Sequence, residues 1–313
     1  MRHDQPRGMT TPVTAAVLAV VAVGGVAASR AMVQGGVVGP DGADAATPPG
    51  KTTIVIAASG AAAPITDALA AAYAAQHPDV VVDVRHATTA PVLAALAAGR
   101  CAIAASPAPA TGAERKRVRF RQKTDAVASP IAMDAVVLFV NPAVNTIESL
   151  TLGQIGDIFA HKIAAWDELG VAIDEIHRIV PDAVTGSLHV LKDRALGGRG
   201  YTTAVKRLPN ARAVVNDTAA DIQAIGVGAL GYATGVRVLR VARDDDTPGV
   251  APSRDNVRSG RYPLAHYIYW YTSGPPTRAV QALIRFAQSR AGQRVIADTN
   301  AGPLPLPLGG GVE

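Results

Sequence analysis

Segments typical of buried β-strands alternate along this chain with segments typical of helices. The strand-like segments are short and rich in β-branched or small apolar residues, whereas the helix-like segments are longer and bounded by proline or glycine. The expected strands are residues 53–57, 80–84, 101–105, 176–180, 213–215 and 236–241, and the expected helices are 64–76, 91–98, 152–159, 218–224 and one that begins at Gly186. This alternation predicts the α/β class, with parallel sheets that carry helices on their faces.

The size and composition of the chain favour a globular protein of two lobes. With 313 residues, of which 49% are hydrophobic and 18% charged, the chain can bury more than one small core. Aromatic residues make up only 4%, which argues against a surface that stacks nucleic-acid bases. We therefore expect no nucleic-acid partner.

Two sets of strand–helix units suggest that a second lobe is inserted into the first. We expect residues 51–126 and 235–313 to form lobe 1 and residues 127–234 to form lobe 2. The chain is expected to cross between the lobes near residues 126–131, in a long apolar segment that contains Pro130, and again near 234–236. Residues 30–50 are rich in Gly, Ala and Pro and are predicted to be a flexible linker.

The N-terminal residues 1–29 have the pattern of an export signal or a membrane anchor. Arg2, His3 and Arg7 precede an apolar stretch over residues 13–28, and small residues before Ser29 suit a signal-peptidase cut. The length of the stretch lies between that of a signal peptide and that of a full membrane span, so both alternatives stay open. Either would place the folded part in the periplasm or elsewhere outside the cytoplasm.

The only cysteine and the most basic segment each have a simple interpretation. Cys101 cannot form an intramolecular disulfide, and its apolar surroundings predict an inert core thiol. Residues 115–123 hold most of the locally concentrated basic charge. Such a run is most often a solvated helix face; a patch that meets a membrane surface or steers anions is the more specific alternative.

Three turns have the composition of anion-binding corners. Residues 57–61, 87–90 and 184–188 each join an expected strand to an expected helix and bring a hydroxyl near the start of that helix. Free backbone N–H groups and the helix dipole favour an anion there. Ser and Thr are also ordinary helix caps, so one such turn means little, but three in one α/β chain predict a convergent site.

Motifs of other functional classes are weak or missing. Residues 226–231 match G-x-G-x-x-G but follow a helix-like segment, so we expect a glycine-rich turn before a hinge strand. Residues 244–246, three aspartates, predict a solvated turn rather than a metal site. Neither H-E-x-x-H nor G-x-S-x-G occurs, and we expect no enzymatic activity, no metal and no cofactor.

The segment 251–264 carries a family resemblance. Pro252 and Ser253 are expected to open a short helix that Gly260 ends, and Tyr262 and Pro263 lead into a strand. This segment closely resembles the C-terminal part of the phosphate-binding proteins of ABC phosphate importers, in which P-S-x-x-N-V-x-x-G-x-Y-P-L recurs. Family-like segments run from 53 to 306 and include residues 54–64, 134–142, 150–159, 166–170 and 226–232.

The resemblance implies the two-lobed type II periplasmic-binding-protein fold, with a hinge and an inter-lobe cleft. It implies a monomer that binds inorganic phosphate or a similar oxyanion between the lobes and presents it to an ABC permease in the membrane. Residues that fall on ligand-contacting positions of the family are Ser59, Thr89, Thr185, Gly186 and Ser187.

Three positions depart from the family's phosphate site. A threonine is replaced by Ala61, an aspartate of an Asp-Ile-Ala strand by Ala102, and an arginine before the Ser-Gly-Thr loop by Pro181. In the family the aspartate accepts a proton from hydrogen phosphate and so rejects sulfate, and the arginine donates a bidentate hydrogen bond. We therefore expect weak and poorly selective binding, unless Arg178 or His86 substitutes for a missing group.

The same losses leave a second functional class open. The alternative to a solute-binding protein is a ligand-free structural or sensory protein that keeps the fold with an eroded anion site. An uncleaved N-terminal anchor would favour this alternative.

Overall fold

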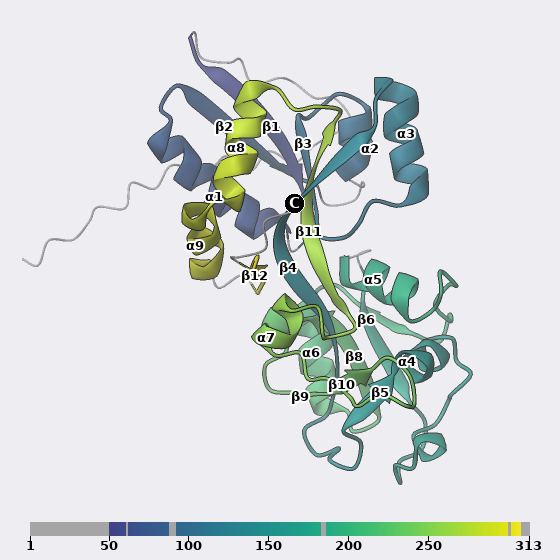
Figure 1. Cartoon of the computed structure of the whole chain (residues 1–313). Coiled ribbons are helices and arrows are strands. Elements are labelled where there is room, and N and C mark those ends of the chain that lie inside the picture. The colour runs from purple at the N-terminus through teal and green to yellow at the C-terminus, as the bar shows by residue number, and fades with distance from the viewer. Residues whose placement is uncertain (1–49, 61, 88–91, 183–185, 300–301, 308–313) are drawn as a thin grey trace, which may run out of the picture. The chain divides into compact units, whose positions relative to one another are not determined.

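The structure is a computed structural model that describes residues 50–60, 62–87, 92–182, 186–299 and 302–307 (Figure 1). The described residues belong to one unit of the chain, Gly35–Glu313. The export signal or anchor and the linker up to residue 49, as well as Thr89 and Thr185, lie outside these ranges. Among the described helices, none combines the length and the hydropathy that a membrane span requires.

Parallel strands from the N-terminal part of the chain form one half of the main sheet. Strand β1 (Thr52–Ala58) pairs in parallel with β2 (Val80–His86) and with β3 (Ile103–Ser106). Strand β11 (Ala265–Ser273) returns from the C-terminal part of the chain and pairs antiparallel with β3. The predicted strands and their parallel pairing are thus confirmed here.

Helices cover both faces of this half of the sheet. Helices α1 (Ala62–Gln76), α8 (Arg278–Gln288) and α9 (Arg290–Asp298) share one hydrophobic core with β1, β3 and the even-numbered residues of β11. Helix α2 (Val92–Ala97) and helix α3 (Gly112–Gln122) pack on the other face, beside Tyr271. Figure 1 shows the two groups of helices on opposite sides of these strands.

A single long strand, β4 (Ala126–Val140), links this half of the sheet to the next. It pairs antiparallel with β11 as far as Ala135, and from Val136 onward it pairs with β8 (Ala224–Ala229). The sheet continues from β8 to β6 (His177–Pro181), which pairs with it in parallel, and then to β7 (Lys206–Leu208), which pairs in parallel with β6. The partition into lobes at residues 126 and 235 stays a prediction.

The second half of the sheet is also covered on both faces. Val137 and Phe139 of β4 pack against α6 (Ala211–Ala220), whereas the alternate residues Val136, Leu138 and Val140 share a core with other elements. Those elements are α4 (Leu152–Phe159), α5 (Gly186–Arg194), α7 (Arg254–Arg258), a parallel pair of β5 (Ser149–Thr151) and β10 (Arg240–Ala242), and β12 (Leu304–Pro305). A further short strand, β9 (Arg237–Val238), pairs with the end of β4.

Three sequence predictions in the second half differ from the structure. Residues 213–215, expected as a strand, lie inside α6, because the Asn210 side chain caps a helix by accepting from the Ala213 N–H at 3.0 Å. The expected helix at 218–224 is the end of this helix and the start of β8. The expected strand at 236–241 is divided between β9 and β10.

Two of the three glycines of the G-x-G-x-x-G match lie in a strand, and only Gly231 lies in a turn, the 3-10 turn Leu230–Tyr232. Gly226 and Gly228 belong to β8, where Gly226 pairs with Phe139 of β4 and Gly228 with Val137. A Cβ on Gly226 would lie 2.2 Å from a Phe139 ring carbon and 2.5 Å from the Thr218 hydroxyl. Close packing of the Phe139 ring against the strand therefore explains Gly226 and Gly228.

Residues 251–264, which carry the family resemblance, make specific structural contacts. Ser253 caps α7, and Gly260, with a φ of +69°, follows its end. The Asn256 side chain donates to Ala251 O at 2.9 Å, and the Tyr262 hydroxyl donates to Val136 O of β4 at 2.9 Å. The motif thus fastens the chain to β4 at the residue where that strand changes partners.

Cys101 is a core residue, as predicted. It lies just before β3, is 8% exposed and contacts the core of α2 and α3. Burial raises the pKa of its thiol to about 11, so the reactive thiolate is scarce at neutral pH.

Candidate ligand-binding site

The turn after β1 is the described corner that best fits an anion. The Ser59 N–H donates to Ala105 O of β3 at 3.3 Å, and Ser59 O accepts from the Ala62 N–H at 3.1 Å, so the chain passes directly from strand to helix. Gly60 has a φ of +51°, a conformation that favours glycine, and lies against Pro107. Ser59 is half-buried, and within the described residues its hydroxyl has no hydrogen-bond partner.

Three strands end beside this corner. In the parallel registers, Ala58 of β1 faces His86 of β2 and Ala105 of β3. Ser59, Ala87 and Ser106 therefore lie along one edge of the sheet, the carboxyl edge where ligands of open α/β sheets bind. Thr89, two residues beyond Ala87, is outside the described residues.

Ser106 is a hydroxyl at this edge that the sequence analysis did not single out. Its Oγ donates to Ala108 O at 2.8 Å and accepts from the Ala108 N–H at 3.3 Å. Ser106 is 9% exposed. Its hydroxyl therefore holds the turn after β3 in shape, a role that a serine followed by proline signals in a sequence.

Ala102 does not lie at the carboxyl edge of the sheet, where a residue that contacts the ligand would have to lie. The Ala102 N–H donates to Val55 O at 2.8 Å, so Ala102 is level with the middle of β1 and precedes β3. Ser59 is four residues further along β1, about 13 Å away along the strand direction. A carboxylate at Ala102 would be exposed on the amino side of β3, so the structure does not bring this position to the corner of Ser59. The effect of its loss on binding stays a prediction.

The second corner follows β6. Pro181 ends this strand, is buried and pairs with Leu208 of β7. The next residue, Asp182, is exposed and donates its N–H to Leu208 O at 2.6 Å. Helix α5 then begins at Gly186, with Ser187 as its second residue. A strand and a helix therefore flank this corner as predicted. Within the described residues, no hydrogen bond joins it to the corner of Ser59.

Arg178 is not a substitute for the missing arginine. Its side chain is 2% exposed, and its three nitrogens donate to three backbone carbonyls: Nε to Ile158 O at 2.6 Å, Nη1 to Ile176 O at 2.8 Å and Nη2 to Ile163 O at 2.6 Å. The carbonyl of Ile158 lies in the last turn of α4, where a cation is favoured. Arg178 thus fixes the end of α4 and the loop after it.

His86 is engaged at the surface. Its Nε2 lies 2.9 Å from Asp67 Oδ2 and 3.0 Å from Asp67 Oδ1 of α1. The side chains are 46% and 32% exposed, which makes this an ordinary surface pair. The alternative that His86 is a satisfied histidine therefore agrees with the geometry.

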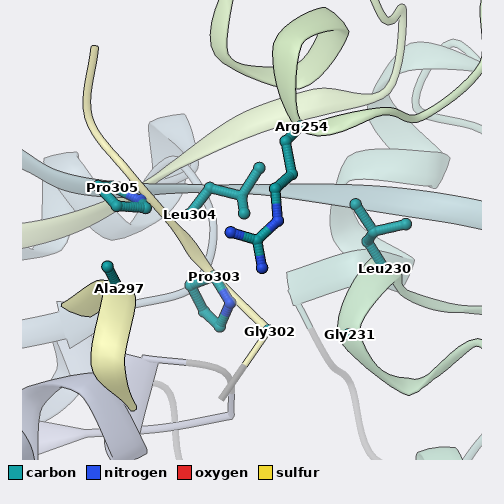
Figure 2. Close-up of a pocket in the computed structure, with 8 residues that line it drawn as sticks. All are labelled: Leu230, Gly231, Arg254, Ala297, Gly302, Pro303, Leu304 and Pro305. Atoms are coloured by element: carbon teal, nitrogen blue, oxygen red, sulfur yellow. The ribbon is translucent and has the colours of Figure 1, made fainter. Parts of the chain in front are cut away.

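A separate open pocket of about 290 Å³ contains none of the predicted ligand residues. Figure 2 shows the Arg254 side chain pointing into this space from α7, between Leu230 and the C-terminal segment. The remaining lining residues are Gly231, Ala297, Gly302, Pro303, Leu304 and Pro305. Among the described residues, no cluster of His, Cys, Asp or Glu could hold a metal ion.

Comparison with known proteins gives the class of this protein. Residues 43–291 match the family model described as the PBP superfamily domain, and the chain belongs to that family. It is 25% identical over 256 residues to the phosphate-binding protein PstS of Bacillus subtilis (strain 168), covering 81% of each chain.

Comparison with solved structures identifies the fold. The ABC-type phosphate transport receptor from Vibrio cholerae has a TM-score of 0.68 and 21% identity, with 80% of this chain and 99% of that chain covered. PstS from Borrelia burgdorferi has a TM-score of 0.62 and 21% identity, with 82% and 99% covered. The protein therefore has the type II periplasmic-binding-protein fold that the resemblance implied.

Proposed function

We propose that this protein is a solute-binding protein that captures phosphate or a closely related oxyanion for an ABC importer. The named relatives are a phosphate-binding protein and a phosphate transport receptor. The protein would act outside the cytoplasm as a monomer and deliver its ligand to a permease in the membrane. No catalytic step belongs to this function.

The observation that carries the proposal is the corner of Ser59. A half-buried hydroxyl, free of partners within the described residues, lies beside the start of the 15-residue helix α1 at the carboxyl edge of the sheet. The N-terminus of such a helix attracts an anion through its backbone N–H groups and dipole. We propose that Thr89, Thr185, Gly186 and Ser187 complete the site from the other two corners when the lobes close.

Neither Arg178 nor Pro181 supplies the proposed site with a cation. Arg178 is committed to three carbonyls, and Pro181 offers neither a charge nor an N–H. The carboxylate of Asp182, next to the corner of α5, adds repulsion toward an anion. Each missing charge-assisted hydrogen bond costs roughly 1.5–3 kcal/mol of binding energy, so we propose a low affinity.

Isothermal titration with inorganic phosphate tests this function. We expect one site per chain in the wild-type protein, and a five- to tenfold weaker Kd in Ser59→Ala and in Ser187→Ala, because a lost neutral hydrogen bond costs about 1 kcal/mol. Ser149→Ala is the matched control, since Ser149 is an exposed serine at the start of β5.

The outcomes separate the two functional classes. Saturable phosphate binding that Ser149→Ala leaves unchanged supports the proposal. A protein that binds neither phosphate nor sulfate at millimolar concentration would instead be the ligand-free structural or sensory protein, and the proposed function would be abandoned.

A further inference from the structure

Helix α3 (Gly112–Gln122) carries an unusual concentration of positive charge. Residues 111–125 contain six basic and two acidic residues, a net charge of +4, whereas the whole chain has a net charge of +5. One of the two acidic residues, Glu114, is used by the helix itself, because its carboxylate accepts from the N–H and the hydroxyl of Thr111 in a capping box. The charge of this protein is thus largely a property of one helix.

Most basic residues of α3 have no ion-pair partner within the described residues. Arg119 Nε lies 2.5 Å from Asp125 Oδ1, and Arg115 donates to Ala110 O. Lys116, Arg117 and Arg121 are exposed and have no ion-pair partner within the described part of the chain. Three cations on one short helix are therefore free to meet an anionic surface.

An exposed aromatic ring lies at the centre of the outward face of α3. Val118 is the buried residue of this helix, and at 100° per residue the positions opposite it are those two residues away, Lys116 and Phe120. Arg117 and Arg119 flank them on either side. The Phe120 side chain is 71% exposed, and the Lys123 ammonium lies 4.9 Å from the centre of its ring.

We propose that α3 is a docking surface for an anionic phospholipid membrane. Phe120 would enter the boundary between headgroups and acyl chains, while Lys116, Arg117 and Arg121 contact lipid phosphates. An aromatic ring surrounded by cations on a surface helix is the arrangement that binds membrane interfaces, because it combines apolar burial with attraction to anionic lipids. The Phe120 ring, 71% exposed, lies among these cations rather than alone on the surface.

The helix is better suited to a lipid surface than to nucleic acid. Only one aromatic residue is exposed on this face, so successive bases have no stacking platform. A flat layer of lipid phosphates, by contrast, can contact basic residues on both sides of Phe120 at once. The membrane next to which a binding protein works would thereby hold it close to its permease.

Fluorescence of the full-length variant Phe120→Trp tests this docking. The natural Trp166 and Trp270 are both fully buried and give a constant background. With vesicles of equal parts phosphatidylglycerol and phosphatidylcholine, we expect a blue shift of emission and quenching by brominated acyl chains. Pure phosphatidylcholine vesicles should give neither, and high salt should reverse the effect.

Two further variants test whether membrane binding depends on α3 and on its positive charge. Ile222→Trp is the matched control, because Ile222 is 49% exposed on the loop between α6 and β8 and does not belong to α3. The triple change Lys116→Gln, Arg117→Gln and Arg121→Gln, with Phe120 kept, should reduce co-sedimentation with anionic vesicles about tenfold or more. An unchanged emission of Phe120→Trp, equal quenching of Ile222→Trp, or a response to single-stranded DNA in place of vesicles would overturn the proposal.

Discussion

Asp134 and His266 face each other directly in the antiparallel pair of β4 and β11, and each side chain is 3% exposed. Directly opposed residues project from the same face of a sheet. Burial raises the pKa of Asp134 to about 7, and burial together with the nearby positive charge of Arg194 lowers the pKa of His266 to about 4. Near pH 5.5 both side chains are therefore uncharged in the folded protein.

The two pKa shifts predict opposite pH dependences that cancel in the wild-type protein. Between about pH 4 and 6.5 the folded state holds one proton, on Asp134, and the unfolded state also holds one, on His266, so the pair contributes no slope to the free energy of unfolding. In Asp134→Asn the His266 contribution remains, and stability is lost as the pH falls from 6.5 toward 4. In His266→Gln the Asp134 contribution remains, and stability is lost as the pH rises from 4 toward 7.

Urea unfolding at pH 4.5 and pH 6.5 measures both effects. We expect the variants to differ from the wild-type protein by slopes of opposite sign, each approaching about 1.4 kcal/mol per pH unit. Two variants whose pH profiles run parallel to that of the wild type would show that the groups are not neutral when buried.

Arg178→Lys is expected to destabilise the protein without changing ligand affinity. A lysine cannot donate to Ile158 O, Ile176 O and Ile163 O at once, so at least one buried carbonyl loses its partner. We expect the free energy of unfolding to fall by about 2 kcal/mol or more in urea. The exposed Arg212→Lys serves as control and should stay within about 0.5 kcal/mol. A folded Arg178→Lys protein with a tenfold weaker phosphate Kd would instead place Arg178 in the site.

Gly231→Ala is expected to displace the C-terminal segment. A Cβ on Gly231 would lie 2.4 Å from Gly302 Cα, a backbone atom that cannot rotate away. We expect a loss of about 1–3 kcal/mol and faster hydrogen exchange in residues 302–306. Gly200→Ala, where a Cβ meets nothing within 4 Å, should be neutral. Equal stabilities of the two variants would contradict the close approach of Gly231 and Gly302.

Ala102→Asp is expected to leave phosphate affinity unchanged. Ala102 is exposed and lies before β3, remote from the carboxyl edge at which Ser59 lies. A new carboxylate there is screened by water and salt. Titration of this variant should give a Kd within twofold of the wild-type value, and a marked gain of selectivity for phosphate over sulfate would show that this position does face the ligand.

The strand–helix alternation predicted the fold class because its signals are local. β-branched runs, Pro64 near the start of α1 and Gly99 after α2 act within one element. The strand expected at 213–215 failed because two adjacent valines favour a strand, whereas the Asn210 cap and packing against Phe139 favour a helix.

The site was predictable only in part, because its geometry depends on where strands end. The corner of Ser59 could be predicted, because an expected strand, a glycine and an expected helix follow one another in the sequence. Ala102 was misplaced because β3 begins two residues later than its apolar pattern suggests, so this residue lies before the amino end of the strand. The partners of Arg178 are carbonyls of two distant segments, which no side-chain pattern indicates.

The central claim is that this is an oxyanion-binding protein with a weakened site. Isothermal titration of the wild-type protein with phosphate and with sulfate tests it most directly, through the ratio of the two affinities. We expect both anions to bind the same site with a Kd weaker than about 10 μM and within about tenfold of each other, because no group identified at the site tests for the ligand's proton. A submicromolar Kd for phosphate together with exclusion of sulfate would contradict this conclusion and require a charged group that replaces the missing ones.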